Sequence, residues 1–133
     1  MSDPQQSALL IDDDELLRDM YARKFRDRGI AVEAVGSAKE ALEKLRAGFL
    51  PDIITFDIVM PGMDGFSFLE TLKKEALAPK AAKIALTNQG ADEEKDRAIA
   101  LGADAYIIKA ATTPTGAVEA VLGAVRDKKG EPH

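Results

Sequence analysis

The sequence contains no cysteine and a single histidine, His133, which is its last residue. Without cysteine there is no disulfide, no thiolate catalysis and no cysteine-based metal site. One histidine at the very end of the chain also excludes a histidine-based catalytic relay and a histidine-rich metal site. Any metal site in this chain must therefore use oxygen ligands.

A surplus of basic residues is also missing. Lysine and arginine number 18 against 23 acidic residues, which gives a net charge of −5. Binding to nucleic acid or to an anionic membrane surface needs clustered positive charge, so this balance argues against both. No apolar run approaches the ~20 residues of a membrane span, and residues 1–6 do not resemble a secretory signal. We therefore expect a cytoplasmic protein.

Short apolar runs alternate with amphipathic stretches along the 133 residues, a length typical of one domain. The apolar runs predict strands at residues 7–11, 30–35, 52–57, 83–87 and 105–109. The amphipathic stretches predict helices at residues 14–28, 38–47, 66–76, 92–101 and from 114 onward. This alternation is typical of an α/β domain with a five-stranded parallel sheet covered on both faces. We expect this domain at residues 7–127, with flexible ends at 1–6 and 128–133.

Polar residues gather where the predicted strands end. Asp12 and Asp13 follow the first strand, and Asp57 ends the third. Thr87 ends the fourth strand and Lys109 the fifth. Because the carboxyl ends of parallel strands form the ligand crevice of an open α/β sheet, we expect these side chains to lie together. Each has an ordinary interpretation alone, as a capping residue or a surface lysine, but the pattern recurs at four strand ends.

Carboxylates, a hydroxyl and an ammonium at one edge of a sheet suit phosphoryl transfer. Crowded carboxylates repel one another, and a divalent cation removes that cost. Ligands that are all oxygen favour Mg²⁺, with Mn²⁺ or Ca²⁺ as alternatives. An ionised aspartate can act as the nucleophile without a general base, which fits the lack of histidine. A threonine hydroxyl and a lysine ammonium are suitable partners for phosphoryl oxygens.

Four segments make the sequence similar to the receiver domains of two-component response regulators. They are IDDDE at 11–15, DIVMPGMDG at 57–65, ALT at 85–87 and GADAYIIK at 102–109. The resemblance covers nearly the whole chain. It implies a single doubly wound (βα)5 domain of flavodoxin-like fold with strand order 2-1-3-4-5. It also implies a stand-alone, phosphorylation-operated signalling switch rather than an enzyme.

The resemblance assigns the acidic residues to phosphorylation and to metal binding. Asp57 matches the phosphoacceptor of the family. Asp12, Asp13 and Asp57 match the carboxylates that hold Mg²⁺, or Mn²⁺ in its place. The backbone carbonyl of Val59 matches a further ligand of the metal.

The resemblance assigns three other residues to the conformational change that follows phosphorylation. Thr87 matches the switch hydroxyl, and Lys109 matches the lysine that contacts a phosphoryl oxygen. Tyr106 matches the aromatic switch residue, although it is also interpretable as an aromatic that covers apolar surface at the sheet edge. The expected phosphodonor is a histidine kinase or a histidine phosphotransfer protein, with small phosphodonors as a further source. The expected output is binding of an unknown protein to the face of the fourth helix, fifth strand and fifth helix.

Three positions depart from the usual pattern of the family. Receiver domains usually have a proline after the lysine, joined by a cis peptide, whereas Ala110 follows Lys109 here. A cis bond before a non-proline residue costs about 3–4 kcal/mol, so we expect a trans bond. Asn88 is larger than the residue that usually follows the threonine, and we expect it to narrow access to the phosphoryl group. Val59 can neither orient nor activate water, which predicts slow self-dephosphorylation.

Two other functions remain alternatives. A phosphatase of the haloacid dehalogenase type also forms an aspartyl phosphate, but it would need an acid where Val59 stands and a cap domain for which the chain has no room. A degenerate receiver would act as a phosphorylation-independent protein-binding adaptor. No output domain follows residue 125, so we expect partner binding to transmit the signal unless the sequence is part of a longer protein.

Overall fold

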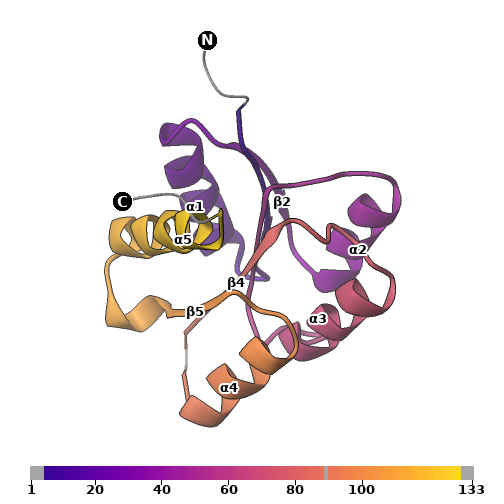
Figure 1. The fold of residues 1–133 in the computed structure, drawn as a ribbon. Coiled ribbons are helices and arrows are strands. Elements are labelled where there is room, and N and C mark those ends of the chain that lie inside the picture. Colours follow the sequence, from indigo (N-terminus) through magenta and orange to yellow (C-terminus); the bar gives the residue numbers. More distant parts are fainter. Residues whose placement is uncertain (1–4, 89, 130–133) are drawn as a thin grey trace.

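The computed structural model describes residues 5–88 and 90–129, in which five strands and five helices alternate (Figure 1). The strands are β1 (Ser7–Ile11), β2 (Ala31–Val35), β3 (Ile53–Phe56), β4 (Ala82–Thr87) and β5 (Ala105–Ile108). The helices are α1 (Glu15–Asp27), α2 (Ala38–Arg46), α3 (Gly65–Lys74), α4 (Asp92–Ala100) and α5 (Pro114–Lys129). A 3-10 turn, η1 (Lys109–Ala111), joins β5 to α5. The predicted order of elements is confirmed, and the ends differ by one or two residues.

All strand pairs of the sheet are parallel, in the order β2-β1-β3-β4-β5. Figure 1 shows α1 and α5 on one face of the sheet and α2, α3 and α4 on the other. Since parallel strands require crossover connections, helices cover both faces. The doubly wound α/β fold and the 2-1-3-4-5 order implied by the resemblance are therefore confirmed.

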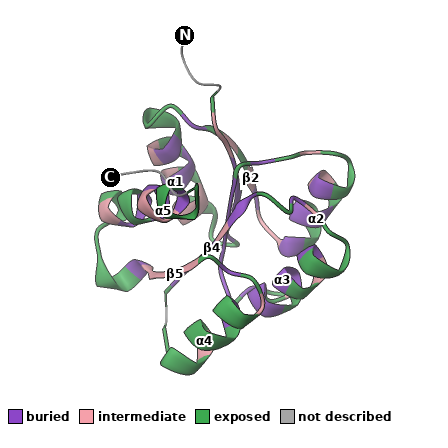
Figure 2. Cartoon of the chain, in the orientation of Figure 1, coloured by how far each residue is buried: buried purple, intermediate pink, exposed green. Residues whose placement is uncertain are grey.

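One apolar core lies on each face of the sheet. In Figure 2 the buried segments, in purple, follow the strands and the inward faces of the helices. One core, under α2, α3 and α4, contains Phe56 and Phe68, whose ring centroids are 5.7 Å apart. The other, under α1 and α5, contains Tyr21 and Phe25. Every residue of β3 is buried. The strands that lie in the middle of the sheet, β1 and β3, are mostly apolar inside, and acidic residues follow directly at their C-terminal ends.

Side-chain caps begin most of the helices. Asp14, Ser37 and Asp64 accept hydrogen bonds from backbone N–H groups at the starts of α1, α2 and α3. Such caps satisfy N–H groups that have no partner within the helix. By contrast, α4 begins after Ala91 without a side-chain cap, and Ala98 is its only buried residue. This helix therefore buries fewer residues against the domain than α1, α2 and α3 do.

The C-terminal helix is longer than the sequence predicted. α5 extends through Lys128 and Lys129, two residues beyond the domain end expected at residue 127. Basic side chains suit the negative end of a helix dipole, and Lys128 Nζ also lies 3.0 Å from Asp104 Oδ1. These two interactions explain why the helix continues. The rest of the expected tail, residues 130–133, lies outside the described residues.

The N-terminal segment contacts the sheet before β1 begins. Gln5 Nε2 donates a hydrogen bond to Gly29 O, and Gln6 O accepts one from the N–H of Ala31. The domain boundaries expected at residues 7 and 127 stay predictions. Residues 1–4 lie outside the described part of the chain.

Candidate functional site

A hollow of about 330 Å³ opens at the C-terminal ends of β1, β3 and β4. Its polar lining consists mainly of residues that directly follow or end these strands: Asp12, Asp13, Asp57, Thr87 and Asn88. Parallel pairing brings the strand ends to one edge, so residues that are 30–45 positions apart in the sequence become neighbours. The convergence predicted from the sequence is present in the structure.

Lys109 lies between two buried carboxylates. Its Nζ is 2.7 Å from Asp12 Oδ2 and 3.7 Å from Asp57 Oδ2. The side chains of Lys109, Asp12 and Asp57 are only 6%, 4% and 8% exposed. Buried charges are stable only when they are paired, so the ammonium compensates much of the repulsion between the carboxylates.

The remaining oxygen of each buried carboxylate binds backbone. Asp12 Oδ1 accepts a hydrogen bond from the N–H of Asp14 at 2.9 Å. Asp57 Oδ1 accepts one from the N–H of Val59 at 3.2 Å. Aspartates commonly bind the backbone two residues ahead in this way. Both carboxylates are thus oriented with Oδ2 toward Lys109 and are fixed by the turns that follow their strands.

The turn after Asp57 requires glycine for steric reasons. The N–H of Gly65 donates to Ile58 O at 2.9 Å and closes the loop. A Cβ at Gly65 would lie 2.6 Å from the carbonyl oxygen of Asp57 and 2.8 Å from Ile58 Cα. These are backbone atoms, which cannot move aside to make room for a Cβ as the end of a flexible side chain can. This close approach explains the glycine that ends the DIVMPGMDG motif.

Two residues near the site were not singled out by the sequence. Arg18 Nη1 donates to Asp12 O at 3.0 Å, which ties α1 to the turn that carries the acidic pair. The ring of Tyr21 lies 5.7 Å from Lys109 Nζ. Helical spacing identifies Tyr21 as a core residue, but no sequence pattern indicates that its ring faces a lysine about 90 residues later.

Tyr106 is bound to α4 and does not line the hollow. Its hydroxyl donates to Glu94 Oε2 at 3.3 Å. Burial and the neighbouring Glu94 raise the pKa of Tyr106 to about 12, so the hydroxyl keeps its proton at neutral pH. The side chain is half-buried against the core below α4. Tyr106 therefore links β5 to α4 rather than to Asp57.

The peptide bond after Lys109 is trans, as we predicted from the missing proline; the described residues contain no cis bond. The 3-10 turn begins at Lys109, so this residue follows β5 instead of ending it. Pro114 begins α5, and Thr113 Oγ1 accepts a hydrogen bond from the N–H of Gly116 at 2.9 Å. This loop leaves Lys109 within reach of both carboxylates.

The oxygen donors of the hollow are suited to a hard divalent cation. The carboxylates of Asp12, Asp13 and Asp57 against the ammonium of Lys109 leave two negative charges, which a dication would neutralise. A fourth carboxylate of the hollow, Asp14, caps α1. Within residues 5–88 and 90–129, no three carboxylates are already arranged as metal ligands. Asp13 is exposed at the rim of the hollow, and its carboxylate is not grouped with those of Asp12 and Asp57 as a ligand set. The chemistry of the donors, which are carboxylate oxygens, suits Mg²⁺.

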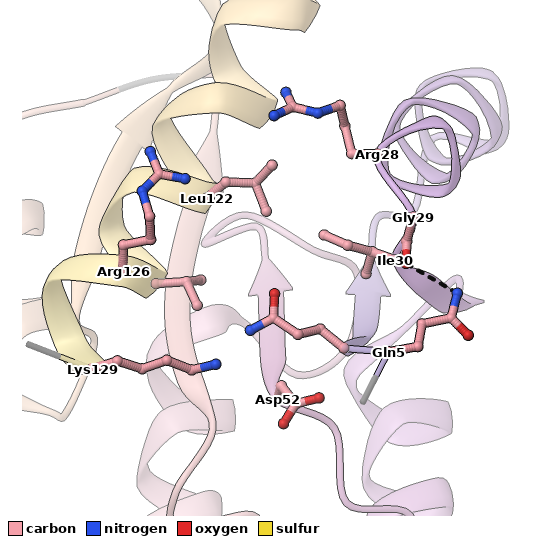
Figure 3. A pocket seen from close by; sticks show the side chains of 10 residues that line it. Gln5, Arg28, Gly29, Ile30, Asp52, Leu122, Arg126 and Lys129 are labelled. Carbon is pink, nitrogen blue, oxygen red and sulfur yellow. Dashed lines mark hydrogen bonds between the residues drawn. The ribbon is translucent and has the colours of Figure 1, made fainter. Parts of the chain in front are cut away.

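A larger hollow, of about 710 Å³, lies at the opposite end of the sheet (Figure 3). Arg28, Arg126 and Lys129 line it, together with Gln5 and Asp52. All five side chains are exposed, and the basic ones follow or end α1 and α5, where they complement the helix dipoles. Size alone therefore does not make this hollow a functional site.

The chain has a doubly wound parallel sheet with a buried aspartate after its central strand. A lysine and a second aspartate lie next to that aspartate. These features define a class of α/β proteins with an acidic site at the strand ends. The family model "Response regulator receiver domain" matches residues 8–119. The chain belongs to this family. Receiver domains are the regulatory domains of two-component systems, signal through a phosphorylated aspartate and generally bind Mg²⁺ at that site.

Curated relatives support the assignment. The chain is 36% identical over 110 residues to the transcriptional activator protein PfeR of Pseudomonas aeruginosa, covering 82% of this chain and 34% of PfeR. It is 42% identical over 105 residues to a protein-glutamate methylesterase/protein-glutamine glutaminase of Methanospirillum hungatei, covering 76% of this chain and 30% of that protein. The chain thus spans about a third of the length of these relatives.

A solved structure supports the fold over most of the chain. A CheY-like response regulator receiver domain protein from Methanospirillum hungatei superposes with a TM-score of 0.83 at 29% identity. The match covers 97% of this chain and all of the other. The receiver family predicted from the four sequence segments is therefore confirmed. Within the described residues, no helix has the length and apolar character needed to cross a membrane.

Proposed function

We propose that this chain is a phosphorylation-operated switch and that Asp57 accepts the phosphoryl group. One observation carries the proposal: the buried Asp57 carboxylate opens onto the hollow with the Lys109 ammonium 3.7 Å from its Oδ2. An ionised aspartate is a competent nucleophile, and a fixed cation beside it stabilises charge that develops on the phosphoryl oxygens.

The transfer step follows from this arrangement. An oxygen of Asp57 attacks the phosphorus of the donor while the bond between the phosphorus and its leaving group breaks. The proposed donor is the phosphohistidine of a histidine kinase or of a histidine phosphotransfer protein, and acetyl phosphate is a small alternative. No general base is needed, because a carboxylate nucleophile has no proton to lose when it attacks.

The residues around Asp57 would then bind the transferred group. Lys109 would shift from Asp12 toward a phosphoryl oxygen, with a short movement of Nζ. Thr87 lines the hollow at the end of β4, where its hydroxyl is suited to donate to a second phosphoryl oxygen. Asn88 lines the same hollow and would narrow its mouth. These contacts would stabilise a rearranged β4–α4 segment.

The proposed metal ligands are the carboxylates of Asp12, Asp13 and Asp57 and the carbonyl of Val59. A bound Mg²⁺ would neutralise charge on the phosphoryl oxygens during transfer. The side chain of Val59 is 69% exposed and apolar, so it offers no group that could orient a hydrolytic water. The proposed aspartyl phosphate is therefore slow to hydrolyse without another protein.

The proposed output is a change in the face formed by α4, β5 and α5. Tyr106 on β5 bonds to Glu94 on α4, so a movement of either residue alters the relation of the two elements. Neither a nucleic acid nor a membrane is the proposed partner, in view of the net charge of −5. The partner would be another protein, or another part of a longer protein.

The test is a titration with beryllofluoride, a phosphoryl mimic, in the presence of Mg²⁺. We expect the backbone NMR signals of Thr87 and Tyr106 to shift in the wild type and to stay unchanged in Asp57→Asn. Phosphorylation by acetyl phosphate, followed by mass spectrometry, should show one added phosphoryl group that the same variant lacks. No response in the wild type would contradict the proposal and favour a phosphorylation-independent adaptor.

A further inference from the structure

Tyr21 is a buried aromatic residue that faces the lysine of the site. It lies in the middle of α1 and is 2% exposed. Its ring centroid is 5.7 Å from Lys109 Nζ. An ammonium within about 6 Å of a ring centroid is attracted to the negative face of the ring.

The surroundings of the ammonium make this attraction strong. Lys109 Nζ has Asp12 at 2.7 Å and Asp57 at 3.7 Å, and its side chain is only 6% exposed. A cation removed from water interacts more strongly with an aromatic ring than one at the surface does. Burial raises the pKa of the Tyr21 hydroxyl, with Lys109 opposing and Asp12 adding to the shift, so the ring remains neutral.

The backbone around Lys109 restrains the side chain little. Lys109 begins the short turn η1, which has no side-chain cap. Ala110 follows by a trans bond in place of the usual proline, and residues 110–115 are exposed. A long lysine side chain on such a turn has many rotamers to lose. The position of the ammonium therefore depends on what its end contacts.

We propose that Tyr21 is a positioning residue, whose ring holds the Lys109 ammonium beside Asp12 and Asp57. This proposal rests on the proposed function, in which Lys109 moves to a phosphoryl oxygen. The two aspartates attract the ammonium in particular directions. A ring face instead attracts a cation over a broad area, so the ammonium can shift between the carboxylates and a phosphoryl oxygen without leaving the ring.

The first test measures the placement of Lys109 without metal or phosphodonor. The nuclear Overhauser effect between Lys109 Hε and Asp12 Hβ reports how closely the ammonium is held to the carboxylate. We expect this effect to be equal in the wild type and in Tyr21→Phe, and weaker in Tyr21→Leu. An unchanged effect in a folded Tyr21→Leu would overturn the proposal. This result does not depend on whether Asp57 is phosphorylated.

The second test measures the rate of phosphorylation by acetyl phosphate with Mg²⁺. We expect Tyr21→Leu to react about ten-fold more slowly than the wild type, and Tyr21→Phe within about two-fold, because Phe keeps the ring face. Trifluorophenylalanine at position 21 keeps the shape of phenylalanine but weakens the charge of the face. Its rate should fall below that of Tyr21→Phe, and equal rates would overturn the proposal.

If Tyr21→Leu does not fold, the phenylalanine and trifluorophenylalanine variants still test the proposal, since neither leaves a cavity. A wild type that is not phosphorylated, but in which the effect between Lys109 and Asp12 depends on the ring, would refute the proposed function and still support the placement of Lys109 by Tyr21. The failures of the two proposals are thus distinguishable.

Discussion

At the scale of single residues, one ammonium compensates two buried carboxylates. Lys109 lies closer to Asp12 than to Asp57, at 2.7 Å against 3.7 Å. The nucleophile proposed for phosphorylation is therefore the less tightly paired of the two. Removing the cation would leave two buried negative charges with backbone hydrogen bonds but no positive charge beside them, which is costly in a poorly solvated site.

Lys109→Met tests this balance, because methionine keeps an unbranched apolar chain and removes the charge. We expect the free energy of unfolding to fall by about 3 kcal/mol, as when one partner of a buried ion pair is removed. Mg²⁺ should restore part of the loss, since a dication between the carboxylates replaces the missing positive charge. Urea unfolding with and without Mg²⁺ measures both effects.

Lys39→Met is the matched control, because Lys39 is an exposed lysine on α2. Its unfolding free energy should stay within about 0.5 kcal/mol of the wild type. Mg²⁺ should stabilise the control and the wild type equally. If Mg²⁺ raised the free energy of unfolding of Lys109→Met and of the wild type equally, Lys109 would not be the cation that compensates Asp12 and Asp57.

At the scale of the elements, α4 differs from its neighbours in how it is held. It has one buried residue, Ala98, and no side-chain cap. Arg97 extends over the ring of Phe66 in α3, with its guanidinium carbon 4.1 Å from the ring centroid. Glu94 accepts the hydrogen bond of Tyr106. Since few apolar contacts hold α4, these two side-chain interactions contribute much of its attachment.

Arg97→Ala is expected to loosen α4 while leaving the domain folded. The variant loses an interaction worth about 0.5–1 kcal/mol at an exposed site. Amide hydrogen exchange in α4 should become several-fold faster, with no change in β1 and β3, whose residues are largely buried. Arg23→Ala, at an exposed arginine of α1, should leave exchange in α4 unchanged. Equal exchange in both variants would show that Arg97 does not hold the helix.

At the scale of the whole molecule, the two cores on either side of the sheet stabilise the edge that carries the site. The aromatic pair of Phe56 and Phe68 joins β3 to α3, the two elements that flank Asp57 and its turn. Both rings are completely buried. A loss of packing here therefore affects the domain and the position of Asp57 together.

Phe68→Ala should lower the free energy of unfolding by about 3–5 kcal/mol, because it removes a fully buried ring and leaves a cavity. Leu16→Ala is the comparison, since Leu16 is 83% exposed, and its effect should be below about 0.5 kcal/mol. Chemical denaturation of the two variants measures the difference. Similar effects in both would contradict the core described here.

Much of the fold could be predicted from the sequence because local periodicity specifies it. Apolar runs and amphipathic stretches predicted each strand and helix, and their alternation predicted a parallel sheet. The extension of α5 through Lys129 was not predicted, because the run of polar residues at 127–129 resembles a tail. Its helical structure depends partly on the distant Asp104, which pairs with Lys128.

For the site, the sequence by itself determined which residues meet. A polar residue at the end of a parallel strand lies at the same edge as the others, whatever the details of packing. Asp12, Asp13, Asp57 and Thr87 therefore line one hollow, and the segments that carry them identify the receiver family.

Only the tertiary structure decided how these residues are paired. The closer approach of Lys109 to Asp12, the ring of Tyr21 below the ammonium and the contact of Arg97 with Phe66 each join different elements of the fold. Such contacts depend on how helices pack on the sheet, and residue spacing carries no information about that packing. The physical reason is that periodicity places a side chain on a face, whereas the three-dimensional packing selects its partner.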